Sequence, residues 1–189
     1  MKIIALEGID GSGKSTLALA LKKALNKLGY SVHLQHFPNY HGKTGKIIKE
    51  ILCGNDPIDE TLLRLLFAAD RRETSASWKD LNVDFIVLDR YTTSGLIYGQ
   101  AKRFPTSWLL ALDTFAVATT HEFVLDIPIN DAIERIMKRN QSGDQYDIDY
   151  ELLIDCKDFY AALSHSCCLD ALNSVENNVE LILERILEI

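Results

Sequence analysis

Gly8-Ile9-Asp10-Gly11-Ser12-Gly13-Lys14-Ser15-Thr16 is the stretch of sequence that decides the fold. It matches the pattern GxxxxGK[ST], in which glycines let successive backbone N–H groups turn toward phosphate oxygens. An apolar run over residues 3–6 precedes it, and leucines at helical spacing over residues 17–28 follow it. The N-terminus of that helix adds the positive end of its dipole. The stretch therefore predicts a loop that binds the phosphates of a nucleotide.

Two side chains of this loop and one acid further along carry the expected chemistry. In such a loop Lys14 bridges the β- and γ-phosphates, and the Ser15 hydroxyl coordinates Mg²⁺. The apolar run over residues 85–88 ends in Asp89, and an acid at the end of such a strand holds the Mg²⁺ shell in P-loop enzymes. An Asp after a strand is also a common turn or capping residue. We expect ATP and Mg²⁺ as ligands, and we expect Lys14 on the solvent side of the loop.

Apolar runs alternate with helical patterns along the whole chain. Because short apolar strands separated by helices form a parallel sheet covered on both faces, we predict an α/β protein. With the phosphate loop, this indicates the three-layer P-loop NTPase fold, with a five-stranded parallel sheet and the site at the carboxyl ends of its strands. The predicted strands are residues 3–6, 32–37, 85–88, 122–127 and 167–172. The predicted helices are residues 17–28, 44–52, 61–78, 105–118, 130–139, 149–163 and 175–189.

Composition narrows the classes of partner. The 189 residues suit a single domain spanning residues 1–189, and 20 Lys and Arg against 27 Asp and Glu give a net charge of −7. No basic run exceeds two residues, so the sequence argues against binding to a polynucleotide or an anionic membrane. No apolar run approaches the roughly 18 residues of a membrane span, and no secretory pattern is present. We expect a cytoplasmic protein with reduced, buried thiols at Cys53, Cys156, Cys167 and Cys168.

Signature motifs of other nucleotide-binding classes are missing from the sequence. A GTPase needs a guanine-reading [NT]KxD motif, and the nearest match, Asn26-Lys27-Leu28-Gly29, lacks the Asp. The LSGGQ signature of transport ATPases is also absent from the sequence. A small-molecule kinase remains, and it needs a second substrate held beside the γ-phosphate.

Further segments follow the phosphate loop in a fixed order. They are Phe37-Pro38-Asn39-Tyr40, Leu66-Phe67-Ala68-Ala69-Asp70-Arg71-Arg72-Glu73, Asp89-Arg90-Tyr91-Thr92-Thr93-Ser94, Leu125-Asp126-Ile127-Pro128 and Tyr146-Asp147. This ordered set resembles the thymidylate kinase family of P-loop nucleoside monophosphate kinases over nearly the whole chain. The resemblance implies transfer of the ATP γ-phosphoryl group to dTMP, giving dTDP and ADP on the route to dTTP.

The resemblance also implies roles for individual residues. Phe67 would stack on the thymine ring, and Arg71 would read a thymine carbonyl. Arg90 would hold the 5′-phosphate of the acceptor, and Asp10 would approach the deoxyribose 3′-OH. Phe67 as an ordinary core residue is the alternative, and the numbering alone does not say whether Arg71 or Arg72 points inward.

Other residues complete the implied acceptor site. Tyr146 would pack against the sugar and disfavour a 2′-OH. Tyr98 and Gln100 lie on the turn after Asp89 that lines the base pocket in the family. Phe37, Pro38 and Tyr40 complete the implied acceptor-binding set.

The chain departs from the family pattern at two places. The family often has an arginine where this chain has Tyr40, so a phosphate contact is either missing or supplied by Lys43 or another group. The family also has a catalytic arginine in the loop or in a lid, which we place at residues 138–150. Here Gly11 occupies the loop position and Gln145 the lid position.

Arg139 is therefore the predicted lid cation, beside Asp10, Lys14 and Arg90 in the catalytic set. Residues 140–150 contain no Lys or Arg, so the cation must come from Arg135, Lys138 or Arg139 on the preceding helix. Arg139 is nearest the stretch Asn140-Gln141-Ser142-Gly143 and so most able to turn inward, and its planar guanidinium suits a phosphate contact. The alternative is that Arg139 only caps the C-terminus of the helix.

Several functions remain compatible with the sequence. A kinase for deoxynucleosides would need a general base, for which Glu7 is the candidate. A kinase for a deoxynucleoside monophosphate different from dTMP also stays open, as does a nucleotide-binding module without turnover. In the family, helices like the apolar one at residues 104–110 form a homodimer interface, although such a helix could instead pack on the sheet.

Overall fold

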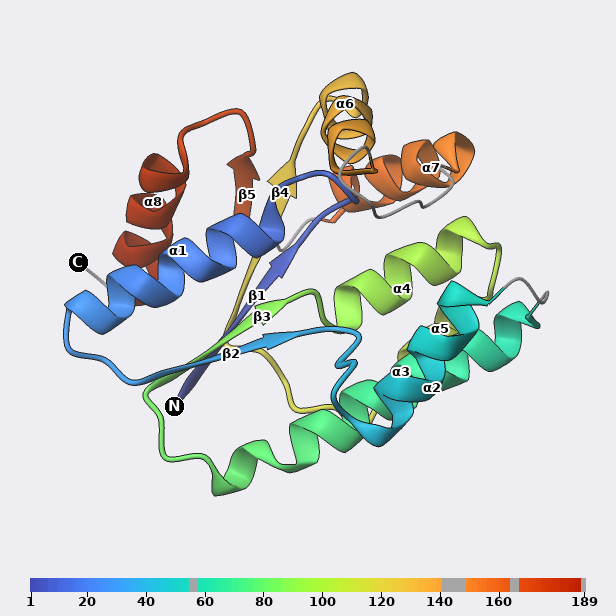
Figure 1. The fold of residues 1–189 in the computed structure, drawn as a ribbon, viewed down its shortest axis with the longest axis horizontal. Coiled ribbons are helices and arrows are strands. Elements are labelled where there is room, and N and C mark those ends of the chain that lie inside the picture. Colours follow the sequence, from blue (N-terminus) through green and yellow to red (C-terminus); the bar gives the residue numbers. More distant parts are fainter. Residues whose placement is uncertain (55–57, 141–148, 164–166, 188–189) are drawn as a thin grey trace.

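A computed structural model describes residues 1–54, 58–140, 149–163 and 167–187 (Figure 1). Its strands are β1 (Lys2–Glu7), β2 (Val32–His36), β3 (Phe85–Asp89), β4 (His121–Asp126) and β5 (Cys167–Asp170). Its helices are α1 (Lys14–Lys27), α2 (Lys43–Cys53), α3 (Glu60–Ala76), η1 (Trp78–Asp80), α4 (Thr92–Ala101), α5 (Thr106–Leu112), α6 (Ile129–Asn140), α7 (Tyr150–Ala161) and α8 (Val175–Leu187).

The five strands form one parallel sheet in the order β2-β3-β1-β4-β5, which confirms the predicted fold class. The central strand β1 pairs with β3 through Leu6 opposite Asp89, and with β4 through Glu7 opposite Val124. Because all strands run the same way, their carboxyl ends meet at one edge. That edge is where ligands bind in open α/β sheets.

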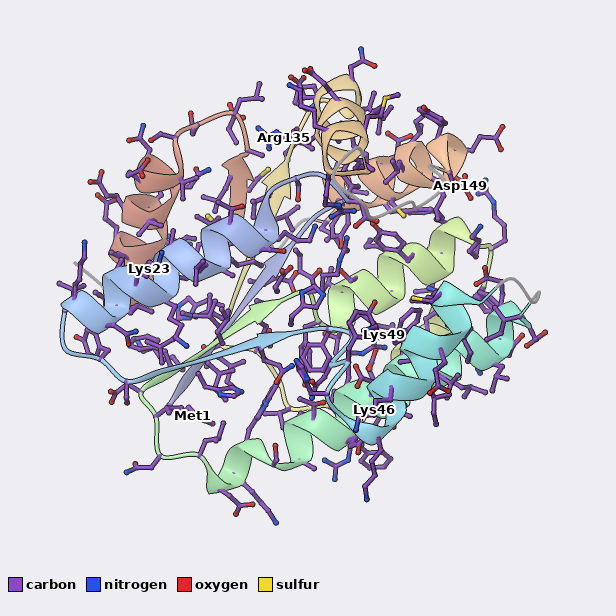
Figure 2. The ribbon with its side chains drawn as sticks, in the orientation of Figure 1. Met1, Lys23, Lys46, Lys49, Arg135 and Asp149 are labelled. Carbon is purple, nitrogen blue, oxygen red and sulfur yellow. The ribbon has the colours of Figure 1, made fainter. Side chains whose placement is uncertain are left out.

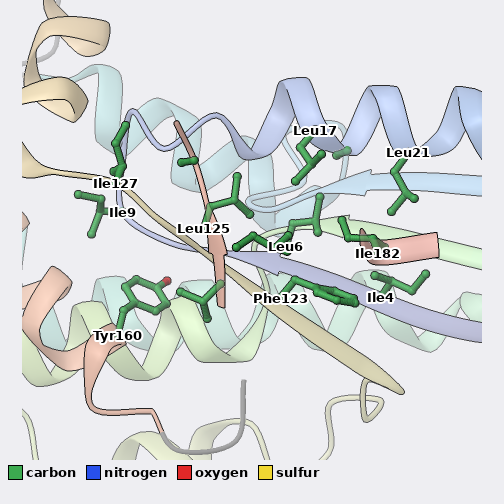
Figure 3. Close-up of a cluster of buried hydrophobic side chains, with 14 of the residues drawn as sticks. Ile4, Leu6, Ile9, Leu17, Leu21, Phe123, Leu125, Ile127, Tyr160 and Ile182 are labelled. Atoms are coloured by element: carbon green, nitrogen blue, oxygen red, sulfur yellow. The ribbon is translucent and has the colours of Figure 1, made fainter. Parts of the chain in front are cut away.

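Apolar side chains of β1 alternate between the two faces of the sheet. Ile4 and Leu6 pack in the larger core cluster, which includes Leu17 and Leu21 of α1 (Figure 3). Ile3 joins a second cluster on the opposite face, together with Ala5, Phe37, Trp78, Ile86, Leu88 and Tyr91. Both faces of the strand are therefore buried, and α1 is fixed against the sheet directly behind the phosphate loop.

Helix α4 is an element that the sequence prediction missed. Residues 92–101 form a helix, so the expected turn after Asp89 is wrong. Its first residues, Thr, Thr, Ser and Gly, are poor helix formers. The buried carboxylate of Glu7 compensates, since its Oε1 accepts from the backbone N–H groups of Tyr91 at 2.8 Å and Ser94 at 3.2 Å. A carboxylate from another element thus caps this helix.

Two further expectations are corrected. The helix predicted over residues 105–118 ends at Leu112, where a turn begins. All four cysteines are free thiols as expected, but only Cys156 is buried, while the other three are exposed. Within the described ranges, no helix is long and apolar enough to cross a membrane.

Candidate active site

The phosphate loop joins β1 to α1 at the predicted place. Gly8, Gly11 and Gly13 have φ angles of 137°, 80° and 96°, which side chains rarely adopt. A Cβ on Gly8 would lie 2.7 Å from the carbonyl oxygen of Leu125, and one on Gly11 would lie 2.4 Å from that of Ala132. The turn therefore favours glycine at all three positions, and close packing on neighbouring backbone also requires it at Gly8 and Gly11.

Lys14 is buried rather than on the solvent side of the loop, so that expectation is wrong. Only 5% of the residue is exposed, and its Nζ donates to the carbonyl oxygen of Ile9 at 2.7 Å and to Ser12 Oγ at 3.3 Å. Burial and the nearby Arg90 lower the pKa of Lys14 to about 8. The ammonium thus folds back into the concave side of the loop, where a bound phosphate would favour its charged form.

Ser15 and Asp89, the predicted metal residues, lie side by side. Ser15 Oγ donates to Asp89 Oδ2 at 2.5 Å, and Nδ1 of His36 lies 2.9 Å from the same oxygen. Although burial opposes ionisation, the hydrogen bond from His36 and the charge of Lys14 hold the pKa of Asp89 below its usual value. Asp89 Oδ1 is buried without a hydrogen-bond partner among the described residues.

These oxygens fit Mg²⁺. The ion prefers carboxylate and hydroxyl oxygens, and it binds through one or two protein ligands together with substrate phosphates. The unsatisfied Asp89 Oδ1 beside the Ser15 hydroxyl is such a donor set. In the described ranges no cluster of three His, Cys, Asp or Glu residues offers a separate metal cage. His36 was missed as part of this site, because its position at the end of β2 gives no signal before the fold is known.

Arg90 connects the phosphate loop to the adjacent cavity. Its backbone has a φ of 69°, and the guanidinium donates to the Gly8 carbonyl oxygen at 3.2 Å and to Ser94 Oγ at 3.0 Å. It also donates to Asp10 Oδ1 at 2.7 Å, while the Tyr98 hydroxyl donates to Asp10 Oδ2 at 3.0 Å. Although burial opposes ionisation, Arg90 and Lys14 hold the pKa of Asp10 well below its usual range. The loop and the cavity therefore share one charged network.

A cavity of about 690 Å³ opens beside this network at the carboxyl edge of the sheet. The segment from Phe37 to Tyr40 forms one wall and is fixed by α3. The N–H of Asn39 donates to Asp70 Oδ2 at 2.8 Å, and its side chain donates to Thr74 Oγ1 at 3.1 Å. The cavity is lined by many of the predicted site residues, namely Asp10, Phe37, Pro38, Tyr40, Phe67, Arg71, Arg90, Tyr98 and Arg139.

Helix α3 supplies the far end of the cavity. Phe67 is half-buried and belongs to neither core cluster, so the alternative that it is a core residue is wrong. Arg71 is buried and Arg72 is exposed, which settles which of the two points inward. Nε and Nη2 of Arg71 donate to the carboxylate of Asp113 at 2.7 and 2.8 Å. Asp113 was not foreseen, since it follows α5, about 40 residues further along.

Comparison with known proteins identifies the family. A family model described as "Thymidylate kinase" matches residues 6–182. The chain belongs to the thymidylate kinase family. This confirms the family predicted from the ordered motifs.

Individual relatives agree with the family match. The thymidylate kinase of Arabidopsis thaliana is 30% identical over 194 residues, which cover 98% of this chain and 72% of that protein. The probable thymidylate kinase of Thermococcus kodakarensis is 30% identical over 202 residues, which cover 97% and 98%. A solved structure of thymidylate kinase from Candida albicans matches with a TM-score of 0.80 at 25% identity, over 99% of this chain and 91% of that one. The P-loop kinase fold is thereby confirmed.

Two described residues considered for the acceptor site of this thymidylate kinase family member, Gln100 and Lys43, do not line the cavity. Gln100 is not among the described lining residues, because its side chain donates to Thr106 Oγ1 at 2.9 Å, near the start of α5. Lys43 is exposed and is not among the described lining residues either. Tyr146 lies outside the described residues, as does Gln145.

Glu7, the candidate base of a nucleoside kinase, is fully buried beneath the cavity. Besides the two backbone N–H groups of α4, it accepts from Ser94 Oγ at 2.5 Å and from the Tyr160 hydroxyl at 3.2 Å. Because both carboxylate oxygens are occupied by structural hydrogen bonds, Glu7 does not serve as a general base for an acceptor hydroxyl.

Two arginines of helix α6, Arg135 and Arg139, lie near the phosphate loop and the cavity. Arg135 Nη1 lies 3.5 and 3.4 Å from the carbonyl oxygens of Gly11 and Ser12, and Nη2 donates to that of Ala171 at 3.1 Å. In Figure 2 this side chain points from α6 toward the segment that follows β5. Arg139, one turn further along, lines the cavity. Lys138 pairs instead with Glu134 at 2.5 Å on the exposed surface.

Proposed function

We propose that this protein is a dTMP kinase that transfers the γ-phosphoryl group of ATP to the 5′-phosphate of dTMP. The observation that carries the proposal is the position of Arg90, which lines the acceptor cavity while donating to the Gly8 carbonyl oxygen of the phosphate loop. A phosphate held by Arg90 would lie beside a γ-phosphate held by the loop. Holding two phosphates in line is most of what phosphoryl transfer asks of a protein.

Each residue of the network has a distinct part. The backbone of the loop and Lys14 bind the β- and γ-phosphates, and Lys14 exchanges its bond to the Ile9 carbonyl for a phosphate oxygen. Ser15 and Asp89 hold Mg²⁺, which supplies positive charge on the phosphate oxygens when it is bound. Arg90 orients the acceptor phosphate, and Asp10 and Tyr98 orient Arg90 before the acceptor arrives. Asp10 also faces the cavity, where the deoxyribose hydroxyl would bind.

The other end of the cavity takes the base. Phe67 offers a ring face for stacking, and Arg71 offers a donor for a base carbonyl. Tyr40 and the Phe37-Pro38 pair close the wall on the sugar-phosphate side. Tyr146 stays a prediction for the contact that disfavours a 2′-OH.

We propose Arg139 as the cation that stabilises charge on the transferring group. It lines the cavity near the end of α6, at the start of the proposed lid at residues 138–150. We further propose that residues 1–189 form a single domain. We also propose that the lid closes over the bound substrates and excludes water, because water would otherwise accept the phosphoryl group.

The proposed assembly is a homodimer through α3 and the α5 region. Leu62 and Leu65 of α3 are 48% and 45% exposed, and Leu110 and Phe115 are 57% and 77% exposed. The Arg71–Asp113 pair places the two segments next to each other. Exposed apolar side chains on neighbouring segments are typical of a protein interface. Sedimentation of the wild-type protein and of Phe115→Asp tests this, and a wild-type monomer contradicts it. A cytoplasmic location stays a prediction.

A coupled ADP-release assay tests the activity with a panel of acceptors. The panel is dTMP, dCMP, dGMP, the ribonucleotide of thymine, and thymidine without a phosphate. We expect dTMP to have the highest kcat/KM and thymidine to be inactive. Faster turnover of dCMP or dGMP would contradict dTMP as the substrate, and turnover of thymidine alone would indicate a nucleoside kinase.

A further inference from the structure

The buried carboxylate of Glu7 in β1 contacts both α4 and α7 beneath the cavity. Its Oε2 accepts from Ser94 Oγ of α4 at 2.5 Å and from the Tyr160 hydroxyl of α7 at 3.2 Å. Its Oε1 accepts from the backbone N–H groups of Tyr91 and Ser94. In Figure 3 the Tyr160 hydroxyl points toward the sheet, and its oxygen also lies 3.0 Å from Ser94 Oγ. These donors stabilise the charged carboxylate, and none of them belongs to the phosphate loop that follows Glu7.

Ser94 links this carboxylate to Arg90. A serine hydroxyl has one proton to donate and two lone pairs that accept. Ser94 Oγ donates its proton to Glu7, since a carboxylate can only accept. The Ser94 oxygen therefore faces Arg90 as an acceptor, and Arg90 Nη1 donates to it at 3.0 Å. The charge of Glu7 thus fixes the direction of the hydrogen bond between Arg90 and Ser94.

The two terminal nitrogens of the Arg90 guanidinium are held by different groups. Nη2 donates to Asp10 Oδ1 at 2.7 Å and to the Tyr98 hydroxyl at 3.3 Å, and the Asp10 side chain is 48% exposed. Nη1 donates to a carbonyl oxygen of the phosphate loop and to Ser94, which is buried together with Glu7. Because water screens an exposed carboxylate, Asp10 holds the guanidinium less firmly than its distance alone indicates. On the Nη1 side, Arg90 is instead anchored by a contact that is shielded from water.

We propose that Glu7 is a positioning residue for the acceptor phosphate, which acts through Ser94 to hold Arg90 in the orientation that receives this phosphate. Tyr160 supports the same carboxylate from α7. Neither Glu7 nor Tyr160 is among the described residues that line the cavity, so both act indirectly. This inference rests on the proposed function, which it deepens by naming the buried group that prepares the acceptor site.

The test compares Glu7→Gln with Ser94→Ala, with the two combined, and with Glu122→Gln. Glutamine keeps the shape of the Glu7 side chain, but its N–H₂ group is a donor where the carboxylate is an acceptor. Glu122 is the matched control, because it lies two residues before the β4 partner of Glu7 and so on the same face of the sheet. It accepts instead from Thr93 Oγ1 at 2.7 Å. For each variant, calorimetry measures the Kd of dTMP, thymidine and ATP, and thermal melting shows whether the protein is folded.

We expect Glu7→Gln to raise the Kd of dTMP by about tenfold or more, as a buried donor without an acceptor does. The Kd of thymidine should not change, because thymidine has no phosphate for Arg90 to receive. The Kd of ATP should also stay constant, although Glu7 directly precedes the phosphate loop and a merely structural role would disturb that loop first. Ser94→Ala should show the same selective loss for dTMP, and Glu122→Gln should leave all three Kd values unchanged.

The combined variant shows whether Glu7 acts through Ser94. We expect Glu7→Gln to change the Kd of dTMP much less in the Ser94→Ala protein than in the wild type, because the link to Arg90 has already been removed. If Glu7→Gln does not fold, Tyr160→Phe replaces it in the same comparison, since this change removes one donor from the same carboxylate.

Additive losses in the combined variant would overturn the inference, because they would show that Glu7 and Ser94 act independently. Equal losses for dTMP and thymidine, or for dTMP and ATP, would also overturn it, since they would show a merely structural role. So would an unchanged Kd of dTMP in folded Glu7→Gln. These outcomes leave the proposed function intact. A wild-type protein that neither binds nor phosphorylates dTMP would instead refute the proposed function, and the inference with it.

Discussion

Asp10 and Arg90 form a 2.7 Å ion pair between the phosphate loop and the end of β3. Only 15% of the Arg90 side chain is exposed, and four oxygen atoms from Gly8, Asp10, Ser94 and Tyr98 accept its hydrogen bonds. A guanidinium held by this many partners does not have to be ordered when a phosphate arrives. The geometry for the acceptor is therefore set before substrate binds.

Replacing Arg90 by Ala should weaken the binding of dTMP much more than that of ATP. Loss of a charge-assisted contact to phosphate predicts a Kd for dTMP that is about ten- to a hundredfold higher. Titration calorimetry with each nucleotide measures this. Arg103→Ala is the matched control, since Arg103 also has a positive φ, of 65°, but pairs with Asp155 at the surface. Equal losses for both nucleotides would count against the acceptor role.

Replacing Lys14 by Met should reduce kcat by at least about a hundredfold, as removal of one electrostatic donor to the reacting group does. The side chains are similar in length, and methionine suits a buried position better than an ammonium does. The melting temperature should therefore stay constant or rise. Steady-state kinetics and thermal melting of one preparation measure both, and activity above about a hundredth of wild type would remove Lys14 from the mechanism.

Replacing Arg139 by Ala separates two roles for this side chain. A transition-state cation predicts a loss in kcat on the order of 10³ with little change in stability. A helix cap predicts near-normal kcat and a loss of about 0.3–1 kcal/mol in the free energy of unfolding. Arg135→Ala is the comparison, because Arg135 contacts loop carbonyls and should mainly change the KM of ATP. A normal kcat for Arg139→Ala would show that Arg139 does not stabilise the transferring group and that another cation does so.

The stability of the protein should depend on Glu122. Burial and the charge of Glu7 raise the pKa of Glu122 to about 7, and Thr93 Oγ1 donates to its Oε2 at 2.7 Å. The folded protein binds this proton more tightly than the unfolded chain does. The stabilisation is therefore fully present below the ordinary pKa of a glutamate, and it is lost as pH rises through about 7.

The variant Glu122→Gln keeps a hydrogen-bond acceptor for Thr93 without the titration. We expect it to melt above wild type at pH 8 and to show a flatter pH dependence between pH 5 and pH 8. Glu134→Gln is the control, because that glutamate is exposed and pairs with Lys138. Equal destabilisation of Glu122→Gln at both pH values would contradict the assignment.

Local chemistry explains which parts of the site were predictable. The phosphate loop and the strand ending in Asp89 are each formed by consecutive residues, and the structure has both where they were expected. The contact of Arg71 with Asp113 joins segments about 40 residues apart, and no local pattern marks it. From the sequence, Glu7 was a candidate general base. The groups that donate hydrogen bonds to its carboxylate lie at the start of α4 and in α7, far along the chain, so no local pattern indicates that the carboxylate is occupied.

Arg64, which is 9% exposed and lines the cavity, was not expected there for a related reason. On the sequence it is one of several charged residues of an amphipathic helix, where a charge most often faces water. Its burial depends on the approach of other elements to α3. Gln100 was predicted to contact the acceptor, but it does not line the cavity. Because residues 92–101 form the helix α4, its side chain points toward the start of α5.

The central place of β1 has a consequence for synthesis on the ribosome. This strand is made before its partners, which are residues 85–89 and 121–124, and the loop it carries packs on the backbone of Leu125 and Ala132. Contacts this distant along the chain form late. Until Ala132 has been synthesised, the nascent chain therefore has the whole phosphate motif without the backbone on which that motif packs. Nucleotide can stabilise this protein only after most of it has been made.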